Sequence, residues 1–384
     1  MKKIFSCLSL IFYCLVSFSQ EKIQVFKSGS ESYNTFRIPA IISLPNGDIL
    51  AFCEGRVNSS ADFGNIDIVM KRSHDHGRTW SAIRTVVDMD SLQAGNPAPV
   101  VDLTDPEYPG GRIFLFYNTG NNNEGEVRKG NGVREVLYRT STDNGNTWSD
   151  PVNITMYVHR PKHTAFNPAY DFPEDWRSFA NTPGHAMQFR TGKYKGRIFV
   201  AANHSAGDPQ REFMDYKASG YYTDDHGETF KISMDVNLPG SNESTAVELS
   251  DNRLMMNSRN QRGDVRARII SVSLNGGETW DSTWFDRSLP DPVNEGSILS
   301  LEKGIVAFSN AANEKRRDNL TLRISYDEGR TWKKNILVES SPDGKRKDFT
   351  AYSDLVRLSR KRIGVLYERD GYKQIVFTAI RWRR

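Results

Sequence analysis

The chain contains few cysteines. Only three occur in 384 residues, and they are Cys7, Cys14 and Cys53. Cys7 and Cys14 lie in an N-terminal apolar segment that we expect to be removed, so Cys53 would remain alone and no intrachain disulfide could form. A secreted protein without disulfides needs a large hydrophobic core, and a chain of this length can supply one.

An excess of charge of one sign is also lacking. Lysine and arginine number 51 against 47 acidic residues, for a formal net charge of +4. This small charge predicts no nucleic-acid partner, because nucleic-acid-binding domains carry a pronounced basic patch. Beyond residue 20 the sequence has no apolar run long enough to span a bilayer. Helical periodicity is nearly absent, which favours an all-β fold.

The N-terminus is the exception to this polar character. Lys2 and Lys3 precede an apolar run over residues 4–18, followed by Ser19 and Gln20. This pattern predicts a cleaved secretory signal peptide over residues 1–20 and a single domain over residues 21–384. We therefore expect a secreted or periplasmic protein. The signal peptide and the lack of disulfides suit a Gram-negative bacterium.

One eight-residue signature occurs five times. It is SHDHGRTW at 73–80, STDNGNTW at 141–148, TDDHGETF at 223–230, SLNGGETW at 273–280 and SYDEGRTW at 325–332. The acidic or amide residue can bind backbone N–H groups, the glycine supplies a positive φ, and the aromatic residue anchors the turn. We interpret the repeated aspartates as structural, since one residue per repeat cannot serve a single site.

Six short apolar runs alternate with these turns. They begin at Ile49, Ile113, Ile198, Leu254, Ile305 and Ile363. Continuous apolar runs bounded by turn residues are typical of strands buried on both faces. Such a repeat predicts a six-bladed β-propeller of four-stranded antiparallel sheets. The ring would close by pairing residues 23–26 with the last blade.

Polar residues follow several of these runs. They are Glu54, Arg56, Asn203, His204, Arg259 and Glu368. Together they indicate convergent groups in one cleft. Arg37, within the apolar sequence FRIP at 36–39, Arg259 and Arg317 come from three different blades. Focused on one point, three guanidinium groups would form a clamp for a carboxylate.

The longest irregular stretch runs over residues 159–188 and is rich in proline and aromatic residues. A loop of this length is usually functional or disordered, and its aromatic content favours packing or ligand contact. A covering loop and a ligand-contacting loop stay open as alternatives. We expect Gln188 and the aromatic residues before it to line the side of the site that receives the substrate's side arms.

The FRIP motif followed by five Asp-box turns resembles the exo-sialidases (neuraminidases) of glycoside hydrolase family 33, over nearly the whole mature chain. The resemblance implies an arginine triad of Arg37, Arg259 and Arg317, with Arg316 as the neighbouring alternative to Arg317. It implies further that Glu368 orients Arg37. Arg56 is expected at the substrate pocket.

The same resemblance assigns three catalytic roles. Tyr352 would be the nucleophile, Glu243 its base partner and Asp62 the acid/base residue. A neutral tyrosine suits a sugar whose anomeric carbon bears a carboxylate, because an anionic nucleophile would be repelled there. The implied reaction is retaining hydrolysis of terminal sialic acids from glycoproteins, glycolipids or oligosaccharides through a covalent tyrosyl-sialyl intermediate.

Two other functions stay open. One is a trans-sialidase or anhydro-product sialidase on the same scaffold, and the other is a non-catalytic carbohydrate-binding propeller. We expect a monomer that needs no cofactor. No histidine or cysteine cluster has metal-ligand spacing, so we expect no catalytic metal, whereas a structural calcium ion stays open.

Overall fold

The computed structural model describes residues 20–383, and over this range the chain is built almost entirely from β-strands. The helices in this range are short: α1 (Glu124–Arg128), α2 (Thr155–Val158) and a 3-10 turn at Arg211–Phe213. No helix in it has the length and apolar character needed to traverse a bilayer. The predicted signal peptide lies outside the described residues except for its last position.

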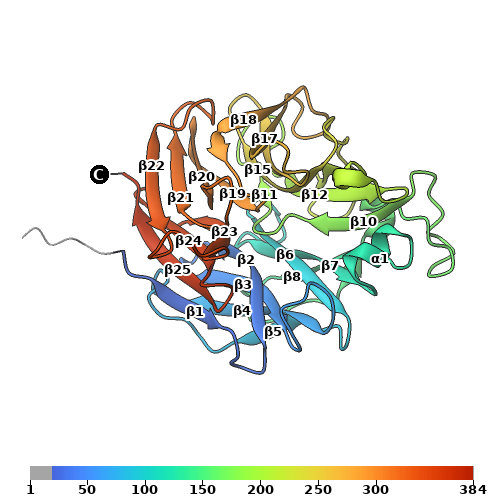
Figure 1. The fold of residues 1–384 in the computed structure, drawn as a ribbon, viewed down its shortest axis with the longest axis horizontal. Helices are drawn as coiled ribbons and strands as arrows, with labels where there is room; N and C mark the ends of the chain where they lie inside the picture. The colour runs from blue at the N-terminus through green and yellow to red at the C-terminus, as the bar shows by residue number, and fades with distance from the viewer. Residues whose placement is uncertain (1–19, 384) are drawn as a thin grey trace, which may run out of the picture.

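The strands form five hydrogen-bonded sheets, and Figure 1 shows these small sheets arranged around a common centre. The first sheet has eight strands: β2 (Thr35–Ser43), β3 (Ile49–Arg56), β4 (Ile66–Ser73), β5 (Arg84–Val87), β6 (Gln93–Asp102), β7 (Arg112–Gly120), β8 (Arg134–Ser141) and β9 (Val152–Asn153). The second has five: β10 (Trp176–Asn181), β11 (Met187–Gln188), β12 (Ile198–Ala206), β13 (Tyr216–Thr223) and β14 (Lys231–Ile232).

The remaining three sheets have four antiparallel strands each. One contains β15 (Ser241–Glu248), β16 (Leu254–Asn260), β17 (Ala267–Ser273) and β18 (Ser282–Pro290). The next contains β19 (Gly296–Glu302), β20 (Ile305–Ala311), β21 (Leu320–Ser325) and β22 (Lys334–Glu339). The last contains β1 (Ile23–Lys27), β23 (Thr350–Arg357), β24 (Arg362–Arg369) and β25 (Gln374–Arg381).

The fold is thus all-β, with a propeller-like arrangement of small antiparallel sheets, as the sequence predicted. The expectation of six separate four-stranded sheets is met in part. The eight-stranded sheet consists of two antiparallel halves, β2–β5 and β6–β9. A single parallel residue pair, Ile66 of β4 with Gln93 of β6, connects them.

The six apolar runs found in the sequence all form strands of this architecture. They lie in β3, β7, β12, β16, β20 and β24, and each pairs on both sides within its sheet. Their side chains are almost wholly buried because both faces of a sheet contact neighbouring sheets. For example, Cys53 and Val69 of the first sheet pack with Leu366 and Phe377 of the last.

The Asp-box turns begin at the last residue of β4, β8, β13, β17 and β21. In the first, the Asp75 carboxylate accepts bonds from the Ser73 hydroxyl (2.8 Å) and from the amide (2.9 Å) and hydroxyl (2.7 Å) of Thr79. Gly77 has φ +88°, and a Cβ there would lie 2.0 Å from the ring of Phe377. The aspartate therefore stabilises the turn conformation. The glycine, which has no side chain, allows the turn to pack directly against Phe377 of the adjacent core.

The stretch over residues 159–188 is less irregular than the sequence suggested. Residues 176–181 form β10, which pairs with β12, and β11 follows it. The prediction of one continuous loop was wrong. Residues 176–181 become a strand because they pair with the buried strand β12, and the prolines of this stretch lie outside the paired residues. Phe179 lines the pocket described below, whereas the exposed Phe166 lies in the loop before β10.

The ring closes through its two end segments, as predicted. β1 pairs antiparallel with β25, so the N-terminal strand completes the sheet that β23, β24 and β25 begin.

Candidate active site

Seven of the eight predicted site residues line one pocket of about 290 Å³. They are Arg37, Arg56, Asp62, Glu243, Arg259, Arg317 and Tyr352. The eighth, Glu368, lies directly behind Arg37 and is fully buried. Residues separated by more than 300 positions in the sequence therefore meet. They do so because the inner strands β2, β15 and β23 all begin at this pocket.

Local backbone geometry aims three of these side chains into the pocket. Arg37, Glu243 and Tyr352 are each the third residue of an inner strand, namely β2, β15 and β23. In each strand the pairing register breaks at that point. Such a bulge bends the strand and redirects a side chain that would otherwise face the adjoining sheet.

Tyr352 and Glu243 form the closest pair in the pocket. The Tyr352 hydroxyl lies 2.6 and 2.7 Å from the two carboxylate oxygens of Glu243. Arg259 donates to Glu243 at 2.6 Å and to the tyrosine oxygen at 2.9 Å. Burial and the Glu243 charge raise the pKa of Tyr352 well above its ordinary value, against the opposing effect of the arginines. The phenol is therefore neutral, with its proton directed at a carboxylate.

Glu368 connects Arg37 to the strand that carries Tyr352. Its carboxylate accepts from Arg37 Nε at 2.6 Å, from the Ile38 amide at 2.9 Å and from the Tyr352 amide at 3.1 Å. Burial disfavours the charged form of Arg37, but Glu368 outweighs this effect and raises the pKa of the guanidinium. Arg37 therefore stays a cation although its side chain is buried.

The structure separates Arg317 from its neighbour Arg316. Arg317 lines the pocket, where its guanidinium donates to the Tyr372 hydroxyl at 3.1 Å and lies 5.5 Å from the centre of the Tyr352 ring. Arg316 instead donates to the carbonyl of Gly344, outside the pocket. Arg317 is thus the member of the pair positioned beside Arg37 and Tyr352.

Asp62 lies at the open side of the pocket. Its side chain is 81% exposed and lies 2.7 Å from Arg56 and 3.9 Å from Arg37. Desolvation opposes ionisation of Asp62, yet Arg56 and Arg37 outweigh it and lower the pKa of the carboxyl. Arg56 is itself held by Glu54 at 2.7 Å.

Sequence reasoning missed some residues of this site. The centre of the Tyr372 ring lies 3.9 Å from the guanidinium carbon of Arg37, so the ring packs against that group. Tyr216 and Glu124 form a hydrogen-bonded pair on the far wall. These residues carry no motif, and only the tertiary arrangement reveals them. The expectation for Gln188 was wrong: its amide binds Asp102 and Thr104, and it lines a different cavity.

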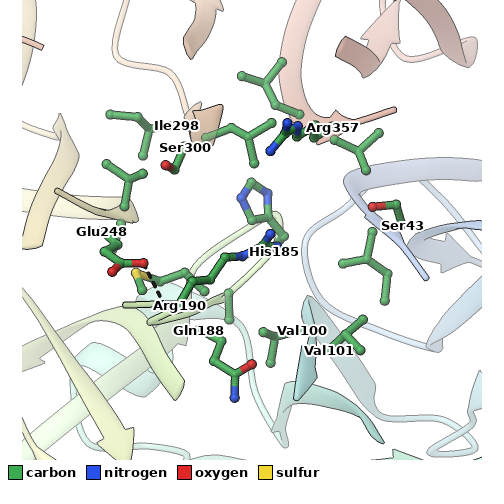
Figure 2. Close-up of a pocket in the computed structure, with 18 of the residues that line it drawn as sticks. Ser43, Val100, Val101, His185, Gln188, Arg190, Glu248, Ile298, Ser300 and Arg357 are labelled. Atoms are coloured by element: carbon green, nitrogen blue, oxygen red, sulfur yellow. Dashed lines mark hydrogen bonds between the residues drawn. The ribbon is translucent and has the colours of Figure 1, made fainter. Parts of the chain in front are cut away.

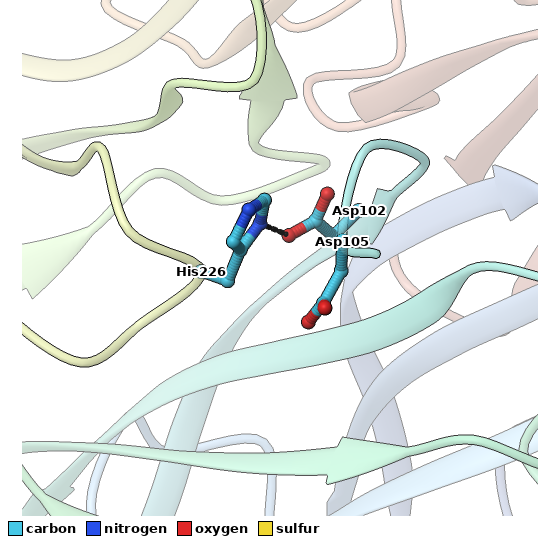
Figure 3. A group of neighbouring side chains, drawn as sticks. All are labelled: Asp102, Asp105 and His226. Carbon is cyan, nitrogen blue, oxygen red and sulfur yellow. Dashed lines mark hydrogen bonds and ion pairs between the residues drawn. The ribbon is translucent and has the colours of Figure 1, made fainter. Parts of the chain in front are cut away.

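One group of acidic and histidine side chains lies away from the pocket. Asp102, Asp105 and His226 offer ligand atoms within 4.8 Å of one another (Figure 3). The Asp102 carboxylate already accepts hydrogen bonds from His226 at 2.7 Å and from Gln188 at 2.6 Å. The Asp105 carboxylate forms an ion pair with Arg112 at 2.9 Å. Because the guanidinium would repel a cation, this group serves the structure as a hydrogen-bonded cluster.

The fold and the repeated turns place the chain among BNR-repeat proteins: a family model described as a BNR repeat-like domain matches residues 47–365. The chain is 31% identical to a sialidase of Micromonospora viridifaciens over 363 residues, covering 89% of this chain and 51% of that protein. It is 30% identical to a sialidase of Paraclostridium sordellii over 379 residues, covering 91% and 86%. The chain belongs to the sialidase family, as its sequence motifs predicted.

Solved structures have the same fold. A microbial sialidase named Hz136 superimposes with a TM-score of 0.75 at 24% identity, covering 92% of this chain and 67% of the other. An intramolecular trans-sialidase of Ruminococcus gnavus superimposes with a TM-score of 0.72 at 16% identity, covering 94% and 97%. The chain spans about half the length of the Micromonospora sialidase.

Proposed function

We propose that the protein is a retaining exo-α-sialidase that hydrolyses terminal sialic acids from glycoproteins, glycolipids or oligosaccharides. The observation that carries the proposal is the contact between Tyr352 and Glu243 next to three arginines in one pocket. Arg37, Arg259 and Arg317 would bind the substrate carboxylate, because guanidinium groups match its geometry and charge.

The arrangement suits attack by a neutral nucleophile. As the Tyr352 oxygen bonds to the anomeric carbon, its proton passes to Glu243 and the glycosidic bond breaks. Asp62 would supply the proton to the departing oxygen. In the second half, Asp62 would remove a proton from water, whose oxygen attacks the anomeric carbon. The Tyr352 oxygen then leaves and regains its proton from Glu243. Two inversions give net retention.

The pKa of Asp62 is lowered in the free pocket, whereas a proton donor must be protonated. The charge of the bound substrate would reconcile the two. The substrate carboxylate would neutralise part of the arginine charge that keeps Asp62 ionised. The bound sugar would also displace water around Asp62, and both changes favour the protonated acid. Substrate binding would thereby prepare Asp62 to donate its proton.

We propose to count the two antiparallel halves of the eight-stranded sheet as separate blades, since one bridging pair joins them. That count gives a six-bladed propeller. We retain the assignment of residues 21–384 to a single catalytic domain and of residues 1–20 to a signal peptide. A monomeric protein, secreted or periplasmic in a Gram-negative bacterium, is the corresponding cellular proposal.

The first alternative is an intramolecular trans-sialidase, whose fold this chain shares. Its product would be an anhydro sugar formed without water. The 81% exposure of the Asp62 side chain supports hydrolysis, since water can reach the group that would activate it. The second alternative is a non-catalytic sugar-binding propeller. Pure binding does not require a tyrosine hydrogen-bonded to a carboxylate, so we favour the enzyme.

An NMR assay with an α-sialoside substrate tests these proposals together. Release of the α-anomer of free sialic acid before mutarotation is expected. First release of the β-anomer would refute retention, and an anhydro product would establish the trans-sialidase. No turnover of several sialoside linkages by folded protein would favour the binding propeller.

A further inference from the structure

A second cavity lies at the other end of the inner strands (Figure 2). Its volume is about 130 Å³, and residues from β2, β6, β11, β15, β19 and β23 line it. Glu248 and Arg357 lie in this cavity, each five residues after a member of the catalytic pocket on the same strand. At the rise of a β-strand this separation is about 17 Å. The cavity is therefore distinct from the candidate active site.

The acidic groups at this cavity are already satisfied. Glu248 accepts from the Arg190 amide at 2.8 Å and from the amide and hydroxyl of Thr191 at 3.0 and 2.5 Å. Asp354, which is fully buried beside His185, accepts from the His185 ring at 2.6 Å and from the Ser297 hydroxyl at 2.7 Å. These donors fix both carboxylates in place, and within the described residues neither carboxylate forms an ion pair with an arginine.

Two guanidinium groups at the cavity form no ion pair with any residue that the structure describes. Arg190 and Arg357 both line the cavity, and in Figure 2 their side chains extend toward its interior near His185. Within residues 20–383 neither guanidinium has a carboxylate within ion-pairing distance. Their positive charges therefore remain available to an anion that enters the cavity.

Much of the remaining wall is apolar, and Ser43, Gln188 and Ser300 add polar groups to it. Val100, Val247, Ile298 and Val356 are buried residues that line it. A cavity of about 150 Å³ holds one benzene molecule, so about six non-hydrogen atoms of an apolar body would fit here. Sialic acid is a poor match, because its many hydroxyl groups would lose water against aliphatic walls.

We propose that this cavity binds a short-chain aliphatic carboxylate. Its carboxylate would lie between Arg190 and Arg357, and its hydrocarbon tail would pack against the valine and isoleucine side chains. Paired guanidinium donors select an anion, and the apolar wall selects a chain of about six carbons over a mineral anion. This inference is independent of the proposed sialidase activity.

Titration calorimetry of the full chain with hexanoate tests the site. Saturable binding in the millimolar range is expected, with weaker binding of 1-hexanol and none of hexylammonium. Arg357→Gln should weaken hexanoate binding at least tenfold. Equal binding of the alcohol and the carboxylate would overturn the assignment, as would absence of saturable binding to the wild type.

Two matched variants identify the place of binding. Arg259→Gln removes a guanidinium from the catalytic pocket and should leave hexanoate affinity unchanged. Arg360→Gln, whose side chain is 84% exposed, controls for a general loss of positive charge. If Arg259→Gln loses hexanoate while Arg357→Gln retains it, the anion binds at the catalytic arginines and the proposal is wrong. The ligand series on the wild type remains decisive if a variant does not fold.

Discussion

The hydroxyl oxygen of Tyr352 lies within 2.7 Å of both carboxylate oxygens of Glu243. One proton donor thus faces a single acceptor group from β15, a strand of another sheet. Arg259 contacts both residues and fixes their mutual position.

Tyr352→Phe should nearly abolish turnover of an aryl sialoside, because it removes the attacking oxygen and leaves the ring in place. Glu243→Gln should lower kcat by about 10²–10⁴-fold, the usual cost of losing a positioned base. Stopped assays on purified variants measure both effects, with thermal unfolding as a check on folding. Tyr326→Phe, an exposed tyrosine in an Asp-box turn, is the matched control. Wild-type rates for Tyr352→Phe would disprove the nucleophile assignment.

Arg317→Gln should raise KM strongly, since it removes one of the cations proposed to bind the substrate carboxylate. Arg316→Gln should leave KM near the wild-type value, because Arg316 contacts the Gly344 carbonyl outside the pocket. Steady-state kinetics of these adjacent variants give a direct comparison. A larger effect at Arg316 would mean that the triad has been assigned to the wrong residue.

Arg56→Gln should move the pH profile of kcat/KM in a defined direction. Arg56 lowers the pKa of Asp62, against the opposing effect of desolvation, so its removal should raise that pKa. Asp62 must be protonated to act as the acid, and the alkaline limb of the profile should therefore shift to higher pH. Asp62→Asn should remove that limb. An Arg56→Gln profile shifted to lower pH would contradict the electrostatic account.

Glu295→Gln should make stability less dependent on pH. Glu295 is buried and accepts from the Ser353 amide at 2.9 Å, and burial raises its pKa well above the ordinary value. Above the unfolded pKa of about 4.3 the unfolded state ionises while the native state keeps its proton, so wild-type stability falls as pH rises. Urea unfolding between pH 5 and 8 should show a smaller decline for the variant. An identical decline would show that Glu295 is ionised in the fold.

Much of the architecture was predictable because its signals are local. Apolar runs such as that at Ile49 are buried on both faces, and an Asp-box turn needs only eight consecutive residues. The bulges at Arg37, Glu243 and Tyr352 were not predictable, since register is set by the partner strand. Tyr372 was missed for the same reason: a tyrosine in a short loop has no signature until Arg37 lies above it.

The pairing of β1 with β25 has a consequence for biosynthesis. A nascent chain can assemble its middle sheets as they emerge, but the last sheet stays incomplete until nearly the whole polypeptide is available. Until then Val25 and Phe26 on one side, and Phe377 on the other, lack the neighbours that cover them. Loss of β1 or of β25 would therefore expose apolar surface and promote aggregation, even though every side chain of the candidate site is still present.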